Sequence, residues 1–407
     1  MKPEPLAVLK ISEKNNKTRT TYKSTRFFYN PAFRSALFQL LAVIALIFFF
    51  YTIINNALTN LSDRGIATGF DFLKQPAGFG IGLSLIDYNE GHSYGRTFIV
   101  GLLNTGLVSI LGIFFATVLG FMIGIARLSS NWLINRLAAL YVETFRNIPL
   151  LLQIFFWYFA VLQALPSPRE SLSFANALFL NVRGLFLPSL AFEPGSQFVL
   201  MALAIGLTSA FSFLIWSKSQ QRKTGKTCSN ARIVFSVSLG LPFIIYWLLG
   251  MPISLQYPEL KGFNYHGGIS IIPELAALLL ALSVYTAAFI SEIVRSGINA
   301  VSQGQSEAAL SLGLSRSQTL QLIIIPQALR IIIPPLTSQY LNLTKNSSLA
   351  MAIGYPDLVS VFAGTTLNQT GQAIEIIAMT MGVYLALSLF TSALMNIYNR
   401  KVALVER

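Results

Sequence analysis

Long apolar blocks separated by short polar segments dominate the pattern of this chain. Seven windows lack Asp, Glu, Lys and Arg over lengths close to those needed to cross roughly 30 Å of hydrocarbon. They cover residues 35–62, 97–126, 147–167, 194–216, 233–257, 275–291 and 376–399. An eighth window, residues 331–356, is interrupted by Lys345 and polar neighbours. Barrel strands alternate between apolar and polar residues, and these windows do not. The pattern predicts an all-α integral membrane protein with about eight transmembrane helices.

The amino-acid composition points the same way. Hydrophobic residues make up 54% of the 407 residues and charged residues only 11%, whereas soluble domains carry about 25% charged residues. This shortage of charge is typical of a protein dissolved in lipid.

The basic residues behind the net charge of +13 collect in the polar segments between the windows. In a soluble protein such a charge would suggest a nucleic-acid partner, but here the positive-inside rule accounts for it. Residues 1–34, 218–232 and 400–407 are basic and are expected in the cytoplasm. Acidic residues outnumber basic ones in residues 62–96, which are expected to face outward. Eight crossings then leave both termini cytoplasmic.

Secretory-signal, disulfide and zinc chemistry are not expected. The polar N-terminal arm is long, and no small-residue cleavage site follows the first apolar window. Cys228 is the sole cysteine, so no internal disulfide can form. His92 and His266 fall in loops expected to face outward, without His or Cys partners nearby, so we expect no metal site.

Four parts can be distinguished along the chain. Residues 1–34 form a basic cytoplasmic arm, and residues 35–96 hold the first transmembrane helix and an outward loop. This loop is rich in Gly and aromatic residues and is expected to pack against the membrane face. Residues 97–399 form the main transmembrane region, with an inserted two-helix region at about 166–270, and residues 400–407 form a cytoplasmic tail.

Residues 301–330 are too polar to cross a bilayer, although they lie between two apolar windows. Two capping boxes, in which a serine is followed three residues later by a glutamine, begin at Ser302 and Ser315. Gly313 is suited to the left-handed residue that ends a helix. Pro326 lies where the chain turns back toward the bilayer. The segment is therefore predicted to form two short helices with a corner between them at the cytoplasmic face.

The first of these helices carries Glu307, Ala308 and Ala309. The small alanine side chains would let another surface approach closely, and Glu307 would supply one fixed charge to register it. An interfacial amphipathic helix is the alternative interpretation. The helix signals alone leave both open.

The spacing in this segment resembles the signature of bacterial ABC-importer permeases. That signature is Glu-Ala-Ala, three residues, Gly, nine residues, Ile, one residue and Leu-Pro. The chain carries it as Glu307-Ala308-Ala309, Gly313, Ile323 and Pro326, with Ile325 replacing Leu. Further matches are Ser291-Glu292-Ile293-Val294-Arg295, Gly304-Gln305, Pro326-Gln327-Ala328-Leu329-Arg330, Lys345-Asn346-Ser347-Ser348-Leu349 and Glu143-Thr144-Phe145-Arg146-Asn147-Ile148-Pro149-Leu150-Leu151.

Together these motifs resemble the polar amino-acid uptake branch, which includes the histidine and glutamine permeases. Three further runs and the two extra spans are similar to the large general L-amino-acid permeases. The runs are Gly69-Phe70-Asp71-Phe72-Leu73, Ala77-Gly78-Phe79 and Gly101-Leu102-Leu103-Asn104-Thr105. The resemblance covers about residues 97–399 and leaves the basic arm unmatched.

The resemblance implies a type I ABC-importer permease core in the bacterial inner membrane, with the permease transmembrane domain at residues 97–399. It implies three partners: a cytoplasmic ABC ATPase dimer, a second permease subunit that is related or identical, and a periplasmic amino-acid-binding protein. Residues Glu307, Ala308, Ala309, Gly313 and Pro326 would couple the chain to the ATPase. ATP and Mg would bind to that ATPase, and this chain would be a transport subunit rather than an enzyme. The sequence has no Gly-x-x-x-x-Gly-Lys-Ser/Thr loop for phosphates, which agrees.

The substrate pathway is harder to place. Lys345, Asn346, Ser347 and Ser348 interrupt an apolar run, and polar residues inside the membrane often line transport sites. A lysine that snorkels from a helix end, with serine caps, is the alternative interpretation. Glu292 and Arg295, three apart on one helix, are expected to form an intrahelical ion pair.

Other functions were weighed against the permease. An ion-coupled secondary transporter of amino acids should show several embedded acidic residues and usually an internal repeat, and neither is evident. An intramembrane enzyme needs a metal-ligand pattern or a nucleophile with a base, and no apolar window holds either. A membrane scaffold without a conduction path is the third possibility. The sequence names neither the amino acid carried nor the second permease.

Overall fold

A computed structural model describes residues 31–63, 65, 68–225 and 231–402. The basic arm before residue 31, residues 226–230 with Cys228, and the end of the tail at 403–407 lie outside the described residues. The chain divides into two compact units, residues 1–68 and 69–407, and each is described by itself. In the first unit, α1 (Pro31–Asp63) is an apolar helix long enough to cross a membrane.

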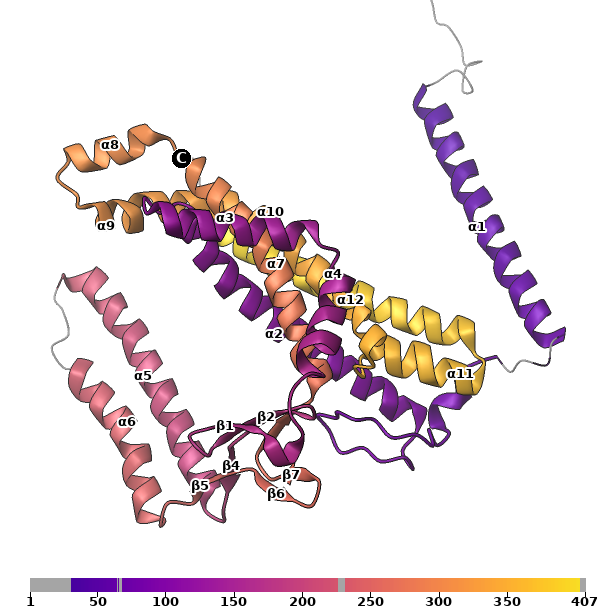
Figure 1. The fold of residues 1–407 in the computed structure, drawn as a ribbon. Helices are drawn as coiled ribbons and strands as arrows, with labels where there is room; N and C mark the ends of the chain where they lie inside the picture. Colours follow the sequence, from indigo (N-terminus) through magenta and orange to yellow (C-terminus); the bar gives the residue numbers. More distant parts are fainter. Residues whose placement is uncertain (1–30, 64, 66–67, 226–230, 403–407) are drawn as a thin grey trace, which may run out of the picture. The chain divides into compact units, whose positions relative to one another are not determined.

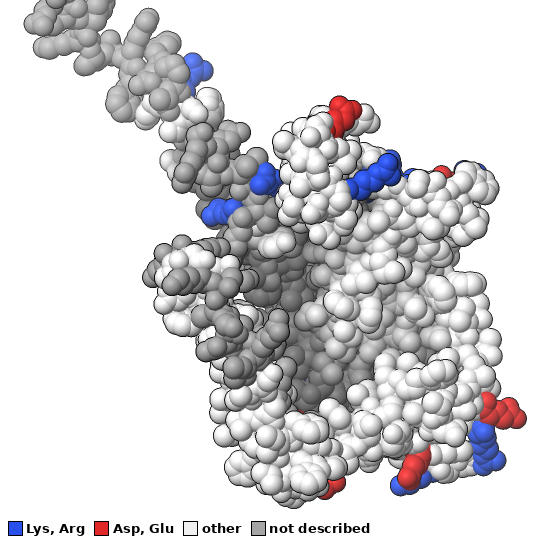
Figure 2. Space-filling model, turned by 90° about the vertical axis from the view of Figure 1, so that its left-hand side faces the viewer, with Lys and Arg blue, Asp and Glu red and all other residues white. Residues whose placement is uncertain are grey.

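The second unit is built around long helices, which run through the centre of Figure 1. They are α2 (Tyr94–Ala126), α3 (Trp132–Asn147), α4 (Leu150–Phe155) continued by the π-helix η3 (Phe156–Leu162), α7 (Pro273–Asn299), α10 (Ile325–Asn346) and α12 (Ala373–Val402). Shorter helices join them: η2 (Asp71–Lys74), η4 (Pro168–Glu170), α8 (Gln303–Ser311), α9 (Arg316–Thr319), η5 (Leu320–Ile324), η6 (Ser347–Ile353), η7 (Val359–Thr366) and α11 (Leu367–Thr370). In Figure 2 the coloured side chains of charged residues lie toward two ends, and the white surface between them carries none.

The described residues hold six helices long and apolar enough to span a membrane, or seven if the bent pair of α3 with α4 and η3 is one span. The bend of 105° in that pair falls at Pro149, because the residue before a proline avoids helical geometry and Ile148 is extended. The sequence predicted about eight spans, and the difference lies in residues 233–257. There the helix ends at Leu248, Gly250 and Met251 take positive φ angles, and a strand begins at Ile253.

Eight short strands, which the sequence analysis did not predict, flank the helical hairpin of α5 (Ser196–Thr224) and α6 (Ala231–Leu248). They are β1 (Leu172–Phe174), β2 (Leu178–Asn181), β3 (Gly184–Leu187), β4 (Ser189–Phe192), β5 (Ile253–Gln256), β6 (Glu259–Lys261), β7 (Asn264–His266) and β8 (Ile269–Ile271). All pairings are antiparallel, in the order β1-β2-β3-β8, with β4–β5 and β6–β7 as separate pairs. The chain leaves β8 directly into α7.

Glycines set the contact between α2 and α7. A Cβ placed on Gly120 would lie 2.6 Å from Ile290 Cβ, and one on Gly124 would lie 2.8 Å from Val294 Cβ. These two glycines are four apart on one face, a spacing that lets transmembrane helices approach until their backbones nearly touch. Gly297 of α7 meets Ile332 of α10 in the same way. The close packing of α2, α7 and α10 therefore depends on glycines, which have no side chain to hold the helices apart.

Residues 69–93, which are expected to face outward, pack against the helices of the second unit. Phe72 is 2% exposed, and its ring lies 6.2 Å from that of Phe362 in η7. The Gly69 N–H donates to Glu375 Oε1 at 2.6 Å, which fixes the start of the segment to the start of α12. The start of this segment is thus fixed to η7 and α12.

We predict that Gly120→Ala destabilises the protein. The added methyl group has no space beside Ile290, and overpacking of this kind costs about 1–3 kcal/mol. Gly106→Ala is the matched control, because it lies on the same helix with nothing within 4 Å of the new Cβ. Thermal unfolding of the detergent-solubilised variants measures the difference. Equal unfolding temperatures would show that the α2–α7 contact is not glycine-limited.

Candidate functional site

The corner between α8 and α9 is closed by the hydrogen bonds of a Schellman motif. The Leu314 N–H donates to the Ala309 carbonyl at 3.1 Å, and the Gly313 N–H donates to the Leu310 carbonyl at 2.9 Å. Gly313 has φ +81°, so the prediction of a left-handed residue there is confirmed. The corner is a defined turn with satisfied carbonyl groups.

The two predicted capping boxes have different outcomes. At Ser315 both bonds are present: the Gln318 N–H donates to the Ser315 hydroxyl oxygen, and the Ser315 N–H donates to Gln318 Oε1. At Ser302 the prediction is wrong, because no side-chain cap forms there. The Gln305 side chain instead accepts a hydrogen bond from Gln327 Nε2 at 3.3 Å. The residue expected to cap α8 therefore ties it to the first turn of α10.

The Glu-Ala-Ala residues face in two directions. Glu307 and Ala308 are exposed, whereas Ala309 is 4% exposed and packs inward. One turn after Ala308 lies Leu312, which is 83% exposed. Leu312 therefore leaves an apolar side chain uncovered beside a small one. Leu312 was not among the predicted site residues, although an apolar residue within a polar segment indicated it.

Pro326 occupies the first turn of α10 and is half-buried. Proline has no N–H to donate to the preceding turn, and the π-helical segment η5 precedes it directly. Wide π turns compensate for such a lost bond. Pro326 thus shapes the return of the chain to the bundle, while the exposed positions lie on α8.

A three-residue ion cluster lies near the end of α7 that leads to α8. Glu292 pairs with Arg295 at 2.5 Å within α7, which confirms the predicted intrahelical pair. Arg127, the residue that ends α2, also pairs with Glu292. Arg127 could not be assigned from spacing, because its partner lies on another helix. The cluster joins α2 and α7 at the end of the bundle from which α8 continues.

The predicted pathway residues fall in two environments. Lys345 is exposed and Ser348 half-buried, and both line a hollow of about 460 Å³. Its other lining residues are Val359, Thr380, Met381, Tyr384, Leu385 and Ser388. Ser347 is fully buried and donates to the Thr344 carbonyl, and Asn346 does not line the hollow. The structure therefore brings two of the four residues together.

Asp357 lies behind this hollow and was not predicted. It is fully buried, its Oδ1 accepts from the Ser360 N–H, and the Tyr384 hydroxyl donates to its Oδ2 at 3.2 Å. Within the described ranges, no group of three His, Cys, Asp or Glu residues is placed to hold a metal ion.

Comparison with known proteins finds relatives that are all described as membrane components of transport systems. The family described as "Binding-protein-dependent transport system inner membrane component" matches residues 116–404. The YhdX protein of Escherichia coli K12, named as an amino-acid ABC transporter permease, is 57% identical over 96% of this chain and 99% of its own length. The general L-amino acid transport system permease protein AapQ of Rhizobium johnstonii is 50% identical over 93% of this chain and 94% of its own.

The glutamate/glutamine/aspartate/asparagine transport system permease protein BztB of Rhodobacter capsulatus is 40% identical over 95% of this chain and 97% of its own length. The family match covers most of the chain, and each of these relatives is matched over almost its whole length. The chain therefore belongs to the family of binding-protein-dependent transport system inner membrane components.

Proposed function

We propose that this chain is the membrane-embedded permease subunit of an ATP-driven importer that carries amino acids across the bacterial inner membrane. The amino-acid systems named for its three relatives support the substrate class. One structural observation carries the coupling: an exposed, rigid corner, α8 with Gly313 and α9, projects between two spans.

The exposed face of α8 is proposed as the ATPase-binding surface. Glu307 offers a charge, Ala308 allows close approach, and Leu312 is the apolar anchor. The Gln305–Gln327 hydrogen bond and the α8–α9 corner make this element move as one body with α10. Closure of the ATPase pair would then bias the bundle between inward- and outward-facing states, as a remote ligand biases a two-state element.

Lys345 is proposed to face the substrate pathway. Two residues earlier, Leu343 packs against Gly112, near the middle of α2. The nearest membrane surface is about 15 Å from that level, too far for a lysine to snorkel. An exposed lysine in lipid at mid-depth costs roughly 2.5–3.5 kcal/mol on insertion scales. A water-filled path or a second permease beside α12 removes that cost.

The family implies an ATPase, a binding protein and a second permease as partners. We propose that ATP and Mg²⁺ bind to the ATPase alone, that this chain needs no cofactor, and that the second permease is a related or identical chain beside the Lys345 hollow. The ion-coupled transporter considered from the sequence finds no support among the relatives. Uptake of labelled amino acids by the reconstituted complex tests the proposal, and uptake that runs without ATP would overturn it.

We expect Leu312→Ser to weaken retention of the ATPase about tenfold, because a leucine buried in an interface is worth roughly 1.5–3 kcal/mol. Leu190→Ser on β4 is the control, since Leu190 is also exposed (57%) but far along the chain from α8. Co-purification of the ATPase measures the effect. If the Leu312 variant retained the ATPase as wild type does, α8 would not be part of the docking surface.

Gly313→Ala should loosen the same coupling for a backbone reason. A left-handed conformation costs a residue with a Cβ about 1–2 kcal/mol, so the corner is expected to relax and ATP-driven uptake to fall several-fold. Gly106→Ala, on α2, should leave uptake unchanged because its φ angle is ordinary, the new Cβ has open space and the residue lies outside the proposed docking surface. If both variants behave alike, the geometry of the corner is not needed for coupling.

Lys345→Met is expected to abolish uptake while the complex still assembles, because the variant keeps an unbranched side chain of similar size and removes its charge. Lys74→Met, an exposed lysine in η2, is the matched control. Radiolabelled uptake and size-exclusion profiles decide the outcome. Normal uptake by the Lys345 variant would exclude it from the pathway.

A further inference from the structure

The outward segment at residues 77–92 is a loop tied by its own hydrogen bonds. The Ala77 N–H donates to the His92 carbonyl at 2.8 Å, and the Gly78 N–H donates to the Glu90 carbonyl at 3.0 Å. The Tyr88 hydroxyl donates to the Phe79 carbonyl at 2.6 Å. Burial raises the pKa of Tyr88, which keeps this donor protonated. The loop is therefore closed on itself at both ends, and Phe79 is tied to Tyr88.

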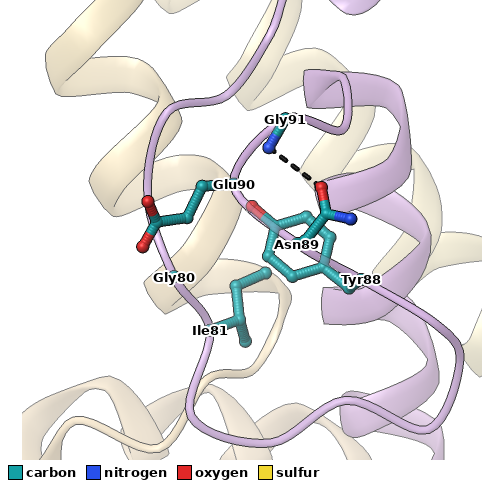
Figure 3. A pocket seen from close by; sticks show the side chains of 6 residues that line it. All are labelled: Gly80, Ile81, Tyr88, Asn89, Glu90 and Gly91. Carbon is teal, nitrogen blue, oxygen red and sulfur yellow. Dashed lines mark hydrogen bonds between the residues drawn. The ribbon is translucent and has the colours of Figure 1, made fainter.

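Two hollows lie on either side of Gly80 and Ile81. The larger, about 540 Å³, is drawn in Figure 3 and is lined only by the loop itself, with the Glu90 carboxylate beside Gly80. Glu90 is exposed, so this hollow is a dent in the surface. The second, about 280 Å³, is walled by three separate elements: residues 79–82, the start of α7, and residues 354–365. Only the second hollow brings distant parts of the chain together.

Glu274 supplies the one carboxylate of the second hollow. It lies in the first turn of α7, and the Tyr158 hydroxyl donates to its Oε1 at 2.9 Å. The part of the chain that the structure describes contains no ion pair to Glu274 and no hydrogen bond to its Oε2. One oxygen is thus held in place and the other is available. A half-buried carboxylate of this kind favours a cationic partner.

Hydrogen-bond donors line the same hollow. No bond is recorded within the described residues for the backbone N–H groups of Gly80, Ile81 and Gly82, nor for the Ser360 hydroxyl. Free N–H groups and a hydroxyl are suited to a carboxylate. A bare metal cation would need more oxygen ligands and no such donors. The lining therefore matches a molecule that carries both an ammonium and a carboxylate group.

We infer that this hollow is an outer binding site for α-amino acids. Glu274 accepts hydrogen bonds from the α-ammonium group, and residues 80–82 with Ser360 donate to the α-carboxylate. Its volume is just below the roughly 300–1,000 Å³ of drug-sized ligand pockets, which suits a small ligand. The inference rests on the proposed function. It adds a site, separate from Lys345, that binds the α-ammonium and α-carboxylate groups shared by all amino acids.

Equilibrium binding of tritiated L-glutamine, L-glutamate and L-alanine to the wild-type complex in lipid nanodiscs, without ATP or binding protein, tests the site. Glu274→Gln should weaken all three at least about tenfold, since a hydrogen bond to a charged group is lost. Gln still accepts from Tyr158, so the local fold is kept. Glu259→Gln on β6, an exposed carboxylate near Lys261, is the control and should bind like wild type.

A second probe separates recognition from structure. 4-Carbamoylbutanoate is glutamine without its α-ammonium group, so wild type should bind it weakly and Glu274→Gln should no longer distinguish it from glutamine. Ser360→Ala should weaken both probes several-fold and serves as the deciding variant if Glu274→Gln does not fold. The site would be overturned if Glu274→Gln still bound glutamine more tightly than 4-carbamoylbutanoate, or if the wild-type complex showed no measurable binding. If Glu274→Gln does not fold, unchanged binding in Ser360→Ala would overturn it. If the wild-type complex still imports amino acids with ATP, the proposed function survives that result.

Discussion

The close contact of α2 with α7 is the constraint on which the rest of unit 69–407 depends. Lipid tails are as apolar as leucine, so helices in a membrane gain little from hydrophobic burial and associate through packing and polar contacts. Gly120 and Gly124 remove the side chains that would separate the two backbones, and Ile290 and Val294 fill the space. Because α7 leads into α8 after three residues, this contact also helps to position the corner proposed for coupling.

The outer half of α2 uses polar groups for the same purpose. The Asn104 amide donates to the carbonyls of Leu83 and Pro356, and the Tyr355 hydroxyl donates to the Asn104 carbonyl. The Thr105 hydroxyl oxygen accepts from the Leu358 N–H. Non-helical backbone is tolerated at membrane depth only where such partners satisfy it. These bonds allow η6 and η7 to be short, broken helices and place Ser360 beside the outward loop.

The sequence identified most of what local rules control. Charge-free windows located the long helices, and Gly313 and Ser315 were read correctly because turn and cap chemistry act within a few residues. The strands were missed because β1–β4 are only three or four residues long, and because β3 and β4 also pair with β8 and β5, which lie far along the chain. Arg127 was missed for the same reason, since its partner is on α7. The capping box predicted at Ser302 does not form, because the Gln305 side chain bonds to Gln327 of α10 instead of to the local backbone.

The helix α7 gives the two proposed sites a physical connection. Glu274 lies in its first turn, Glu292 pairs with Arg127 and Arg295 near its other end, and the chain then enters α8. The helix has no described break over its 27 residues, so we expect it to shift as one body when the corner moves. The outer hollow is walled by the start of α7 on one side and by the tied loop on the other. A shift of α7 against that fixed loop would change the distance between Glu274 and the donors at residues 80–82. ATP-driven motion could in this way release an amino acid from the outer site without any contact between the two sites.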